Sequence, residues 1–238
     1  MILKDVTFSS PKHNLLYDDV LLHQAENENQ QEVARIWESR KLFIVLGRIS
    51  KASEDVFLEN AYHDQVPVLR RSSGGGTVLQ GKGCLNYSLI LDKERHKALN
   101  DIQGSYKHIL SLMIEVFKRL NITAEYFPVS DIAIRENQKK FSGNAQKRGR
   151  RFILHHGTVL YDFKLDLIPR YLKLPKSIPQ YRQQRSHENF VTNIPIQRDD
   201  FISAFKETFS LKERSKEVTL EEEKLLNTLL SKEDRPVL

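Results

Sequence analysis

The sequence has little cysteine and no long apolar run. Cys84 is the single cysteine among 238 residues, which excludes an intrachain disulfide framework and a metal site built on several thiolates. No apolar run approaches the roughly 20 residues that a membrane-spanning helix needs. The first residues, Met1 to Val6, lack the apolar core of a signal peptide. We therefore expect a cytoplasmic protein that folds by packing alone.

The composition is that of an ordinary globular protein with a positive charge balance. Hydrophobic residues make up 39% and charged residues 29%, which argues against a disordered or collagen-like chain. Lysine and arginine number 37 against 31 acidic residues, a formal net charge of +6. This excess of positive charge favours anionic partners, and a nucleotide, a nucleic acid or an acidic protein surface could each be the partner.

Apolar runs and their spacing predict alternating strands and helices. Helices are expected at 14–39, 100–120, 199–209 and 219–230, and strands at 41–48, 66–71, 85–91, 123–127, 131–135 and 151–161. The polar segment 138–149 and the proline-marked stretch 169–179 are expected to be irregular. The pattern predicts an α/β or α+β fold, a mixed β-sheet with flanking helices. We expect a domain over residues 1–195 and a short helical C-terminal extension over 196–238.

The segment from Arg70 to Ser88 is rich in glycine and begins with two arginines. Gly74, Gly75 and Gly76 free the backbone of side chains, so its amides can approach a bound group beside fixed positive charge. This pattern favours an anion site, and a simple tight turn is the alternative. The spacing Gly76, Gly81, Lys82 imitates a P-loop. That motif is excluded because Gly83 replaces the required Ser or Thr and because a strand, not a helix, is expected next.

A second glycine-bearing segment, Lys139 to Lys147, is strongly basic. Lys140 precedes the small residues from Ser142 to Ala145, which we expect to form a turn. A lysine beside such a turn can place its ammonium against a phosphate or a developing oxyanion. A solvated basic loop is the alternative. The presence of the arginine and glycine segment in the same chain favours a site.

The order of these motifs resembles that of the lipoate-protein ligase A family. The matching segments are Arg-Arg-x-Ser-Gly-Gly-Gly-x-Val from Arg70, Leu-Asn-Tyr-Ser from Leu85, Ser-Asp-Ile at 130–132, Lys-Phe-Ser-Gly-Asn-Ala-Gln from Lys140 and His-His-Gly-Thr-Val-Leu from His155. The resemblance covers about residues 14–193. It implies the catalytic-domain fold shared by biotinyl and lipoyl protein ligases, which is related to class II aminoacyl-tRNA synthetases.

The resemblance also implies a reaction and its partners. Lipoate and ATP, with Mg²⁺, would give lipoyl-AMP, and the lipoyl group would pass to a lysine of a lipoyl-domain acceptor. Such acceptors include 2-oxoacid dehydrogenase acyltransferase subunits and glycine cleavage H protein. No membrane and no nucleic acid is expected as a partner. Residues 196–238 are too few for the accessory domain of many such ligases. The chain is then a minimal ligase, needs a separate accessory subunit, or retains only the transfer step.

Residue roles follow from the same resemblance. Lys140 is implied as the catalytic residue, in contact with the carbonyl and phosphate oxygens. Gly74 to Gly76 would form the wall of the acyl tunnel, Asp131 and Asn144 would border the nucleotide, and His156 would line the pocket. The full set expected to bind lipoate or acyl-AMP is Arg70, Arg71, Ser73, Gly74, Gly75, Gly76, Asn86, Asp131, Gly143, Asn144, Ala145, His156, Gly157 and Thr158. No metal-ligating residue is assigned.

Two alternatives stay open. Octanoyl or lipoyl transferases of the same fold start from an acyl thioester or a preformed acyl-AMP, and the thioester route uses a cysteine. The sole candidate here is Cys84, which we expect to be packed in the core. A protein that binds nucleic acid through the basic stretch Arg135 to Arg151 is the other alternative. Its stacking candidates include Phe141 and Phe152, although aromatic residues in strands usually pack in the core.

Overall fold

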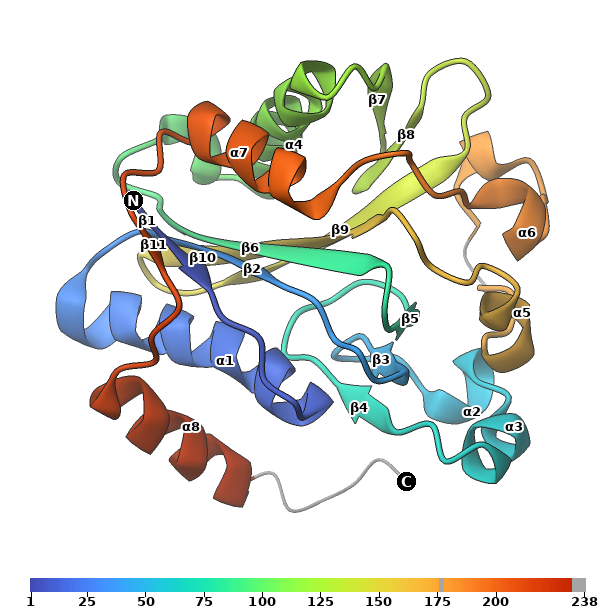
Figure 1. Ribbon diagram of the computed structural model, residues 1–238, viewed down its shortest axis with the longest axis horizontal. Helices are drawn as coiled ribbons and strands as arrows, with labels where there is room; N and C mark the ends of the chain where they lie inside the picture. The colour runs from blue at the N-terminus through green and yellow to red at the C-terminus, as the bar shows by residue number, and fades with distance from the viewer. Residues whose placement is uncertain (176–177, 233–238) are drawn as a thin grey trace.

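The fold is built on a large mixed β-sheet (Figure 1). The structure, a computed structural model, describes residues 1–175 and 178–232. The strands of the large sheet are β1 (Ile2–Asp5), β2 (Val33–Trp37), β6 (Cys84–Asp92), β7 (Ala124–Phe127), β8 (Asp131–Ile134), β9 (Lys140–Arg148), β10 (Phe152–Leu160) and β11 (Arg214–Ser215). Their order is β11, β1, β2, β6, β10, β9, β8, β7. Strand β1 pairs in parallel with β2 and β11, and the other pairs are antiparallel.

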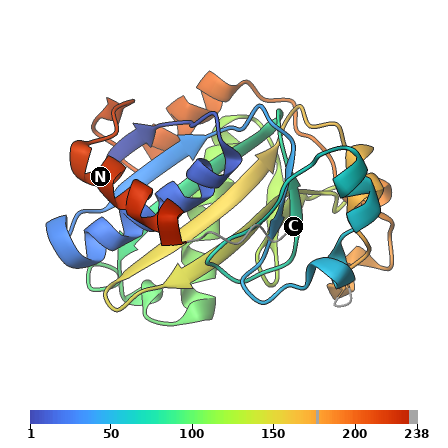
Figure 2. The ribbon, with the colours of Figure 1, turned by 90° about the horizontal axis from the view of Figure 1, so that it is seen from below.

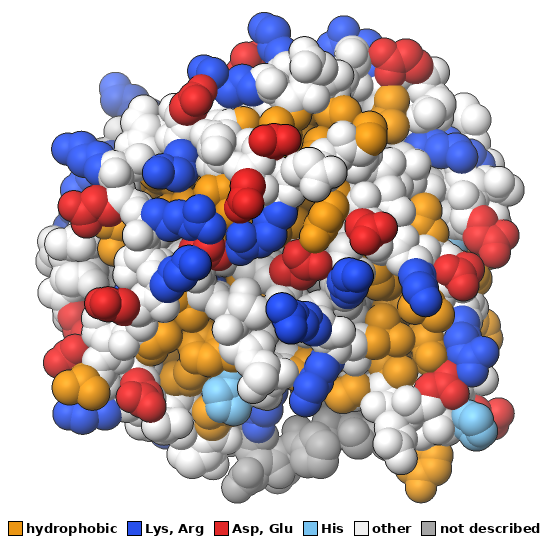
Figure 3. Space-filling model, viewed as in Figure 1, with side chains coloured by type: hydrophobic (Ala, Val, Ile, Leu, Met, Phe, Trp, Pro, Cys, Tyr) orange, Lys and Arg blue, Asp and Glu red, His pale blue; other side chains and the backbone are white. Residues whose placement is uncertain are grey.

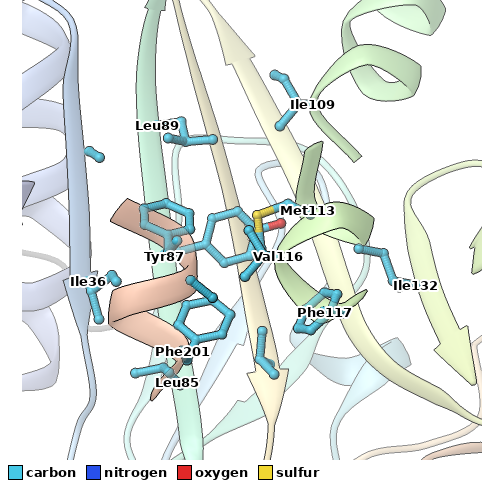
Figure 4. Packing of buried hydrophobic residues seen from close by; sticks show 14 of the residues in the cluster. Ile36, Leu85, Tyr87, Leu89, Ile109, Met113, Val116, Phe117, Ile132 and Phe201 are labelled. Carbon is cyan, nitrogen blue, oxygen red and sulfur yellow. The ribbon is translucent and has the colours of Figure 1, made fainter. Parts of the chain in front are cut away.

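Helices α4 (Ile102–Arg119) and α7 (Arg198–Thr208) cover one face of the sheet (Figure 1). Asp101 caps α4 by accepting a hydrogen bond from the Gly104 amide. Met113 and Phe117 of α4 are fully buried against the sheet (Figure 4). Phe201 of α7 belongs to the same cluster. Residues beyond position 195 therefore complete the main hydrophobic core.

Helices α1 (Pro11–Gln24) and α8 (Leu220–Lys232) cover the opposite face. A buried ion pair fixes α8, because Nζ of Lys4 lies 2.9 Å from Oε1 of Glu222. The hydroxyl of Tyr17 on α1 donates to Oε2 of the same glutamate at 2.7 Å. Breaking such a buried pair from one side typically costs about 3–5 kcal/mol. The C-terminal helix is thus tied to both β1 and α1.

A small three-stranded sheet lies beside α1, below the large sheet in Figure 1, and Figure 2 shows it from another side. Its order is β4 (Val68–Arg70), β3 (Phe43–Leu46), β5 (Val78–Gln80). The remaining helices are short: α2 (Ala52–Asp55), α3 (Leu58–His63), α5 (Leu167–Tyr171), α6 (His187–Phe190), the π-helix η1 (Ala25–Asn29) and the 3-10 helices η2 (Lys97–Leu99) and η3 (Gln180–Arg182). The glycine-rich segment connects β4 to β5.

The helix predicted for residues 14–39 is only partly correct. Helix α1 ends at Gln24, a π-helical turn follows, and β2 begins at Val33. Every residue of β2 is buried because the strand lies between β1 and β6. Arg35 is buried as well, and its guanidinium donates to Oδ1 of Asp18 at 2.7 Å. Tertiary pairing therefore overrides the helical preference of the local sequence.

The prediction of an irregular loop at 138–149 is also wrong. The segment forms β9, which pairs with β8 on one side and β10 on the other. The turn of small residues expected from Ser142 to Ala145 is part of this strand. The stretch predicted to be irregular at 169–179 includes the end of α5, and its residues 176–177 lie outside the described residues.

Candidate functional site

The strand register brings four of the predicted site residues into one row. Asn86 of β6 pairs with Thr158 of β10, Thr158 pairs with Gly143 of β9, and Gly143 pairs with Asp131 of β8. Side chains opposite one another in a sheet lie about 4.5–5.5 Å apart at Cβ. The Thr158 hydroxyl donates to Oδ1 of Asn86 at 2.6 Å and accepts from Nε2 of Gln80 at 2.7 Å. Four separate sequence motifs thus meet in one row.

His156 and Ala145 form the next row on the same face. They pair with each other across β10 and β9. Residues two positions apart on a strand share a face, so His156 stands beside Thr158 and Ala145 stands beside Gly143. This face of the sheet carries six of the residues expected to bind the acyl-adenylate.

Asn144 and Gly157 lie on the opposite face. Tyr87, whose ring belongs to the core beneath α4 and α7, donates its hydroxyl to Oδ1 of Asn144. A Cβ added to Gly157 would overlap that oxygen and lie 2.7 Å from the Tyr87 ring. Glycine is required at this position because the asparagine and tyrosine close over the backbone. The structure therefore does not place these two residues with His156.

Arg71 holds the glycine-rich turn in shape. Its Nε donates to the Ser73 hydroxyl at 3.0 Å, and its Nη2 donates to the carbonyls of Gly74 and Gly76, each at 2.7 Å. Gly75 has φ of 86°, a left-handed conformation that favours glycine. Burial lowers the pKa of Arg71 to about 10, so the guanidinium stays charged at neutral pH. The turn therefore contains a fixed positive charge, as the sequence predicted.

The glycine turn contacts the central sheet at two points. The Ser73 hydroxyl lies 2.6 Å from Nε2 of His156 on β10. A Cβ added to Gly75 would lie 3.6 Å from Cβ of Ala145 on β9, which is ordinary van der Waals distance. The glycine-rich segment and the lysine-bearing segment, far apart in the sequence, therefore lie against each other.

Two neighbouring aspartates of α1 support this contact, and the sequence reasoning did not assign them. Oδ2 of Asp18 lies 4.0 Å from Nδ1 of His156 and accepts a hydrogen bond from the Ser88 hydroxyl at 2.7 Å. Burial, with a smaller contribution from the charge of Arg71, lowers the pKa of His156 to about 3. The imidazole is consequently neutral, and a proton on Nδ1, facing Asp18, leaves Nε2 free to accept from Ser73.

Asp19 ties the glycine turn to β9. Its Oδ1 accepts a hydrogen bond from the Ser72 hydroxyl at 2.6 Å and lies 2.8 Å from Nζ of Lys147. The sequence signals for Asp18 and Asp19 are two adjacent carboxylates in an otherwise apolar part of a helix and the Asn-Leu-Leu-x-Asp-Asp segment from Asn14, which also resembles the lipoate-protein ligase A family. Such carboxylates need partners when the helix packs on a sheet.

The ammonium of Lys140 lies on the same face as the glycine turn. Nζ is 2.7 Å from Oδ1 of Asp131, and the lysine side chain is 27% exposed. A Cβ added to Gly143 would lie 2.9 Å from Nζ, so the glycine leaves room for the lysine to cross the strand. Gly143 and Ala145 are two residues apart, which is roughly 7 Å along a strand. The ammonium lies beside Gly143, and the glycine turn approaches β9 at Ala145, so the ammonium is about 7 Å from the glycine turn.

Arg70 points to a neighbouring turn instead of the glycine-rich one. Its Nη1 donates to the carbonyls of Gly47, Arg48 and Ser50 at 2.9, 3.2 and 2.7 Å. Gly47 in turn packs so closely on the carbonyl of Gly75 that no Cβ fits there. Arg70 thus supports the glycine turn from behind.

An apolar cluster lies between the two sheets next to the glycine turn. Trp37, Phe43 and Val45 form its buried part, with Leu69 and Val78 packed against them. Leu69 and Val78 both pair with Val45, one on each side. Within the described part of the chain, the indole nitrogen of Trp37 is buried and has no hydrogen-bond partner.

The residues that the two alternative functions would use, Cys84 for the transferase and Phe141 and Phe152 for nucleic-acid binding, are buried. The Cys84 side chain is in the core, and burial raises the pKa of its thiol well above the usual range. A thiol in that state is a poor nucleophile. Phe141 and Phe152 are fully buried, so neither ring can stack on a base.

Lysine and arginine side chains are intermixed with acidic ones on the face in Figure 3. Among the described residues, no helix is both long and apolar enough to cross a membrane.

The sequence is similar to known ligases and to a transferase. It is 31% identical to a putative lipoate-protein ligase A of Aeropyrum pernix over 160 residues, 67% of this chain and 57% of that protein. It is 29% identical to one of Schizosaccharomyces pombe over 168 residues, 71% of this chain and 44% of the relative. An octanoyltransferase LipM of Brevibacillus brevis is 25% identical over 228 residues, 84% of this chain and 82% of that protein. The chain thus spans about half the length of the two ligases.

The fold is also found in solved structures. A bi-partite lipoate protein ligase from Thermoplasma acidophilum superimposes with a TM-score of 0.83 at 22% identity, over 99% of this chain and 95% of that chain. A lipoate-protein ligase A bound with ATP gives 0.82 at 22% identity, over 97% and 94%. The predicted mixed sheet with flanking helices is therefore confirmed as the fold of lipoate-protein ligases. The family described as the lipoyl protein ligase A/B catalytic domain matches residues 10–210, and the chain belongs to this family.

Proposed function

We propose that this protein is a lipoate-protein ligase that joins lipoate to ATP and then passes the lipoyl group to a lysine of a lipoyl-domain acceptor. The observation that carries the proposal is the approach of Gly75 to Ala145, so close that a Cβ on Gly75 would lie 3.6 Å from that of Ala145, which brings the glycine turn onto the strand that bears Lys140. Positive charge and free backbone amides then surround one small region. An adenylating enzyme needs such charge and positioning, and it needs no protein nucleophile.

In the first step the carboxylate of lipoate attacks the α-phosphorus of ATP and pyrophosphate leaves. Negative charge accumulates on the phosphate oxygens during this attack. Lys140 is exposed enough to exchange its partner Asp131 for such an oxygen. The amides of Gly74 to Gly76 are the second source of positive potential, because no side chain lies between them and a ligand.

In the second step the neutral amine of the acceptor lysine attacks the acyl carbonyl and AMP leaves. The same ammonium of Lys140 would stabilise the oxyanion that develops on the carbonyl. Arg71 and Lys140 both raise the local positive potential, which disfavours the protonated form of the incoming lysine. Both effects accelerate formation of the amide bond.

Mg²⁺ fits this site as a companion of ATP. Within residues 1–175 and 178–232, no three His, Cys, Asp or Glu side chains gather as a metal site. Asp131 already binds Lys140 and the hydroxyl of Tyr181. Magnesium is commonly held by substrate phosphates with few protein ligands, and it offsets the charge of those phosphates. The residues present suit an ion that arrives with the nucleotide.

The apolar cluster of Trp37, Phe43 and Val45 would support the hydrocarbon end of the acid, which would contact the partly buried Leu69 and Val78 packed on that cluster. The cluster lies beside the strand residue Leu69 that leads into Arg70 and the glycine turn. An acid with its carboxylate at the turn and its chain on this cluster removes apolar surface from water, worth about 0.8 kcal/mol for each buried CH₂ group. Short-chain acids should therefore be poor substrates.

Transfer from an octanoyl thioester is the second candidate, supported by the similarity to octanoyltransferase LipM. It is the weaker one because the single cysteine of the chain is buried and its pKa is raised. The test is to incubate the purified protein and an acceptor lipoyl domain with lipoate and ATP, with octanoate and ATP, or with octanoyl thioester alone. Intact-mass spectrometry of the acceptor then reports the acyl gain.

The expected result is acylation in the presence of free acid and ATP. Acylation from the thioester without ATP would establish the transferase. No gain from any donor, preformed lipoyl-AMP included, with an active control ligase in parallel, would refute both. A fourth reaction with preformed lipoyl-AMP separates the two steps. If the protein transfers the lipoyl group from the adenylate but does not form the adenylate, it either needs a separate accessory subunit or retains only the transfer step.

A further inference from the structure

The segment that follows α5 reaches the lysine of the candidate site through a tyrosine. The hydroxyl of Tyr181, in the 3-10 helix η3, donates to Oδ2 of Asp131 at 2.7 Å. The other oxygen of the same carboxylate, Oδ1, lies 2.7 Å from Nζ of Lys140. Asp131 thus has one oxygen for each partner.

Aromatic packing fixes the Tyr181 ring. It stacks on Phe127 with the centroids 4.3 Å apart and the planes 19° from parallel. Phe190 of α6 packs on it at 5.2 Å. Such aromatic pairs contribute about 0.5–1.5 kcal/mol beyond the area that they bury. The hydroxyl is therefore held in place without the help of its hydrogen bond.

The segment is anchored to the strand that carries the lysine. Arg185 donates to the carbonyls of Asn137 and Gln138, just before β9, at 3.3 and 3.2 Å. Further along, the amide of Thr192 donates to the carbonyl of Lys140 itself at 2.9 Å. The segment 181–192 therefore contacts the start of β9 through both main chain and side chains.

We propose that Tyr181 is a positioning residue, whose hydroxyl orients the Asp131 carboxylate so that the carboxylate holds the Lys140 ammonium at the reaction centre. The proposal rests on the proposed function of Lys140. A lysine side chain has four rotatable bonds and a point charge, so it has no fixed direction of its own. A carboxylate that is free to rotate cannot give it one. A hydrogen bond to one oxygen removes that rotation.

The hydroxyl keeps its proton and acts as a donor. Burial and the charge of Asp131 raise the pKa of Tyr181 far above its usual value. The neighbouring Tyr126 on β7 provides a matched comparison, because its hydroxyl donates to the main-chain carbonyl of Val129 at 2.9 Å and not to the carboxylate.

The first test compares Tyr181→Phe with Tyr126→Phe in the acceptor-lipoylation assay. Tyr181→Phe keeps the stacked ring and removes the hydroxyl, so we expect kcat to fall about tenfold with an unchanged KM for lipoate. That loss is smaller than the roughly 100-fold typical of removing a direct transition-state donor. Tyr126→Phe should leave both constants unchanged. A kcat for Tyr181→Phe within twofold of wild type, or a rise in KM alone, would overturn the proposal.

The second test is a double-mutant cycle with Asp131→Ala, with the folded state of each variant confirmed by its melting temperature. If Tyr181 acts through Asp131, Tyr181→Phe causes no further loss of kcat in the Asp131→Ala background. An equal tenfold loss in both backgrounds would show a separate role and overturn the proposal.

A measurement that needs no activity separates this proposal from the proposed function. Reductive ¹³C-methylation of lysines keeps their charge, and the Lys140 signal is identified by its absence in Lys140→Arg. We expect this signal to shift and broaden in Tyr181→Phe and not in Tyr126→Phe. An unchanged signal would overturn the positioning role even if the enzyme is an active ligase. A changed signal in a protein without ligase activity would refute the function alone.

Discussion

The hydroxyl of Ser73 lies 2.6 Å from Nε2 of His156, and this contact joins the glycine turn to the central sheet. The Ser73 hydroxyl also accepts from Nε of Arg71 at 3.0 Å, and its own proton remains available for a hydrogen bond to the neutral imidazole. The imidazole must be neutral to accept that proton. Protonation of His156 would place a second positive charge near Arg71 in a mostly buried position, so the folded site favours the uncharged histidine.

We predict a pH dependence of stability from this neutral histidine. The pKa of His156 in the folded protein is about 3, below the value of 6.5 for an unperturbed histidine, because the ring is buried. The unfolded state binds more protons between these values, so this contribution to stability is lost as pH falls below about 6.5. At pH 5 it amounts to about 2 kcal/mol. Urea unfolding of wild type and His156→Gln at pH 7 and pH 5 measures it. Equal losses in both proteins would contradict the assignment.

Replacing Lys140 should abolish most of the transfer. Lys140→Ala removes the ammonium that lies 2.7 Å from Asp131, and we expect kcat to fall on the order of 100-fold. Lys139→Ala is the matched control, because it removes the same charge one residue before β9 begins. Steady-state lipoylation kinetics measure both. Near-normal turnover of Lys140→Ala would remove this lysine from its proposed role.

Gly157→Ala should destabilise the fold. The new Cβ would lie 2.7 Å from the Tyr87 ring and overlap Oδ1 of Asn144, so the core must shift, at about 1–3 kcal/mol. Gly74→Ala is the control for stability, because nothing lies within 4 Å of its Cβ. Denaturant unfolding should show a change within about 0.5 kcal/mol for this control. Equal stability of the two variants would show that Tyr87 and Asn144 do not close over Gly157.

Cys84→Ser should leave ligation unchanged when activity is expressed per folded molecule. The thiol is buried and protonated, and its replacement costs stability because a hydroxyl is buried in its place, about 1–3 kcal/mol. Activity of the folded variant with lipoate and ATP is the measurement. Complete loss of activity would revive the acyl-enzyme route.

The sequence predicted the segments whose local pattern agrees with their place in the fold. The strand at 85–91 is mostly apolar and buried on both faces, the helix at 100–120 is apolar on its buried face, and they appear as β6 and α4. The glycine turn and Lys140 were recognisable because rare residue types occur together in a fixed order. Their contact through Gly75 and Ala145 needed the strand register, which no local pattern contains.

The failures occur where tertiary partners override local preference. β9 was missed because most of its side chains are polar, whereas in the fold these polar groups have partners, as Lys140 has Asp131 and Lys147 has Asp19. β2 was missed because Arg35 looks like an exposed helix position, whereas in the fold it is buried against Asp18. The short strands β1 and β5 exist through their pairing with distant partners. Departures from local rules are expected at functional positions.

The most direct test of the account is calorimetric titration of three proteins, wild type, Lys140→Ala and Gly75→Ala, with a non-reactive analogue of lipoyl-adenylate. The lysine variant loses a charged hydrogen bond, and the glycine variant forces an alanine into φ of 86° beside Nη2 of Arg71. Each should weaken binding about tenfold or more. Failure of wild type to bind the analogue, or undiminished affinity in either variant, would contradict a single acyl-adenylate site built from both segments.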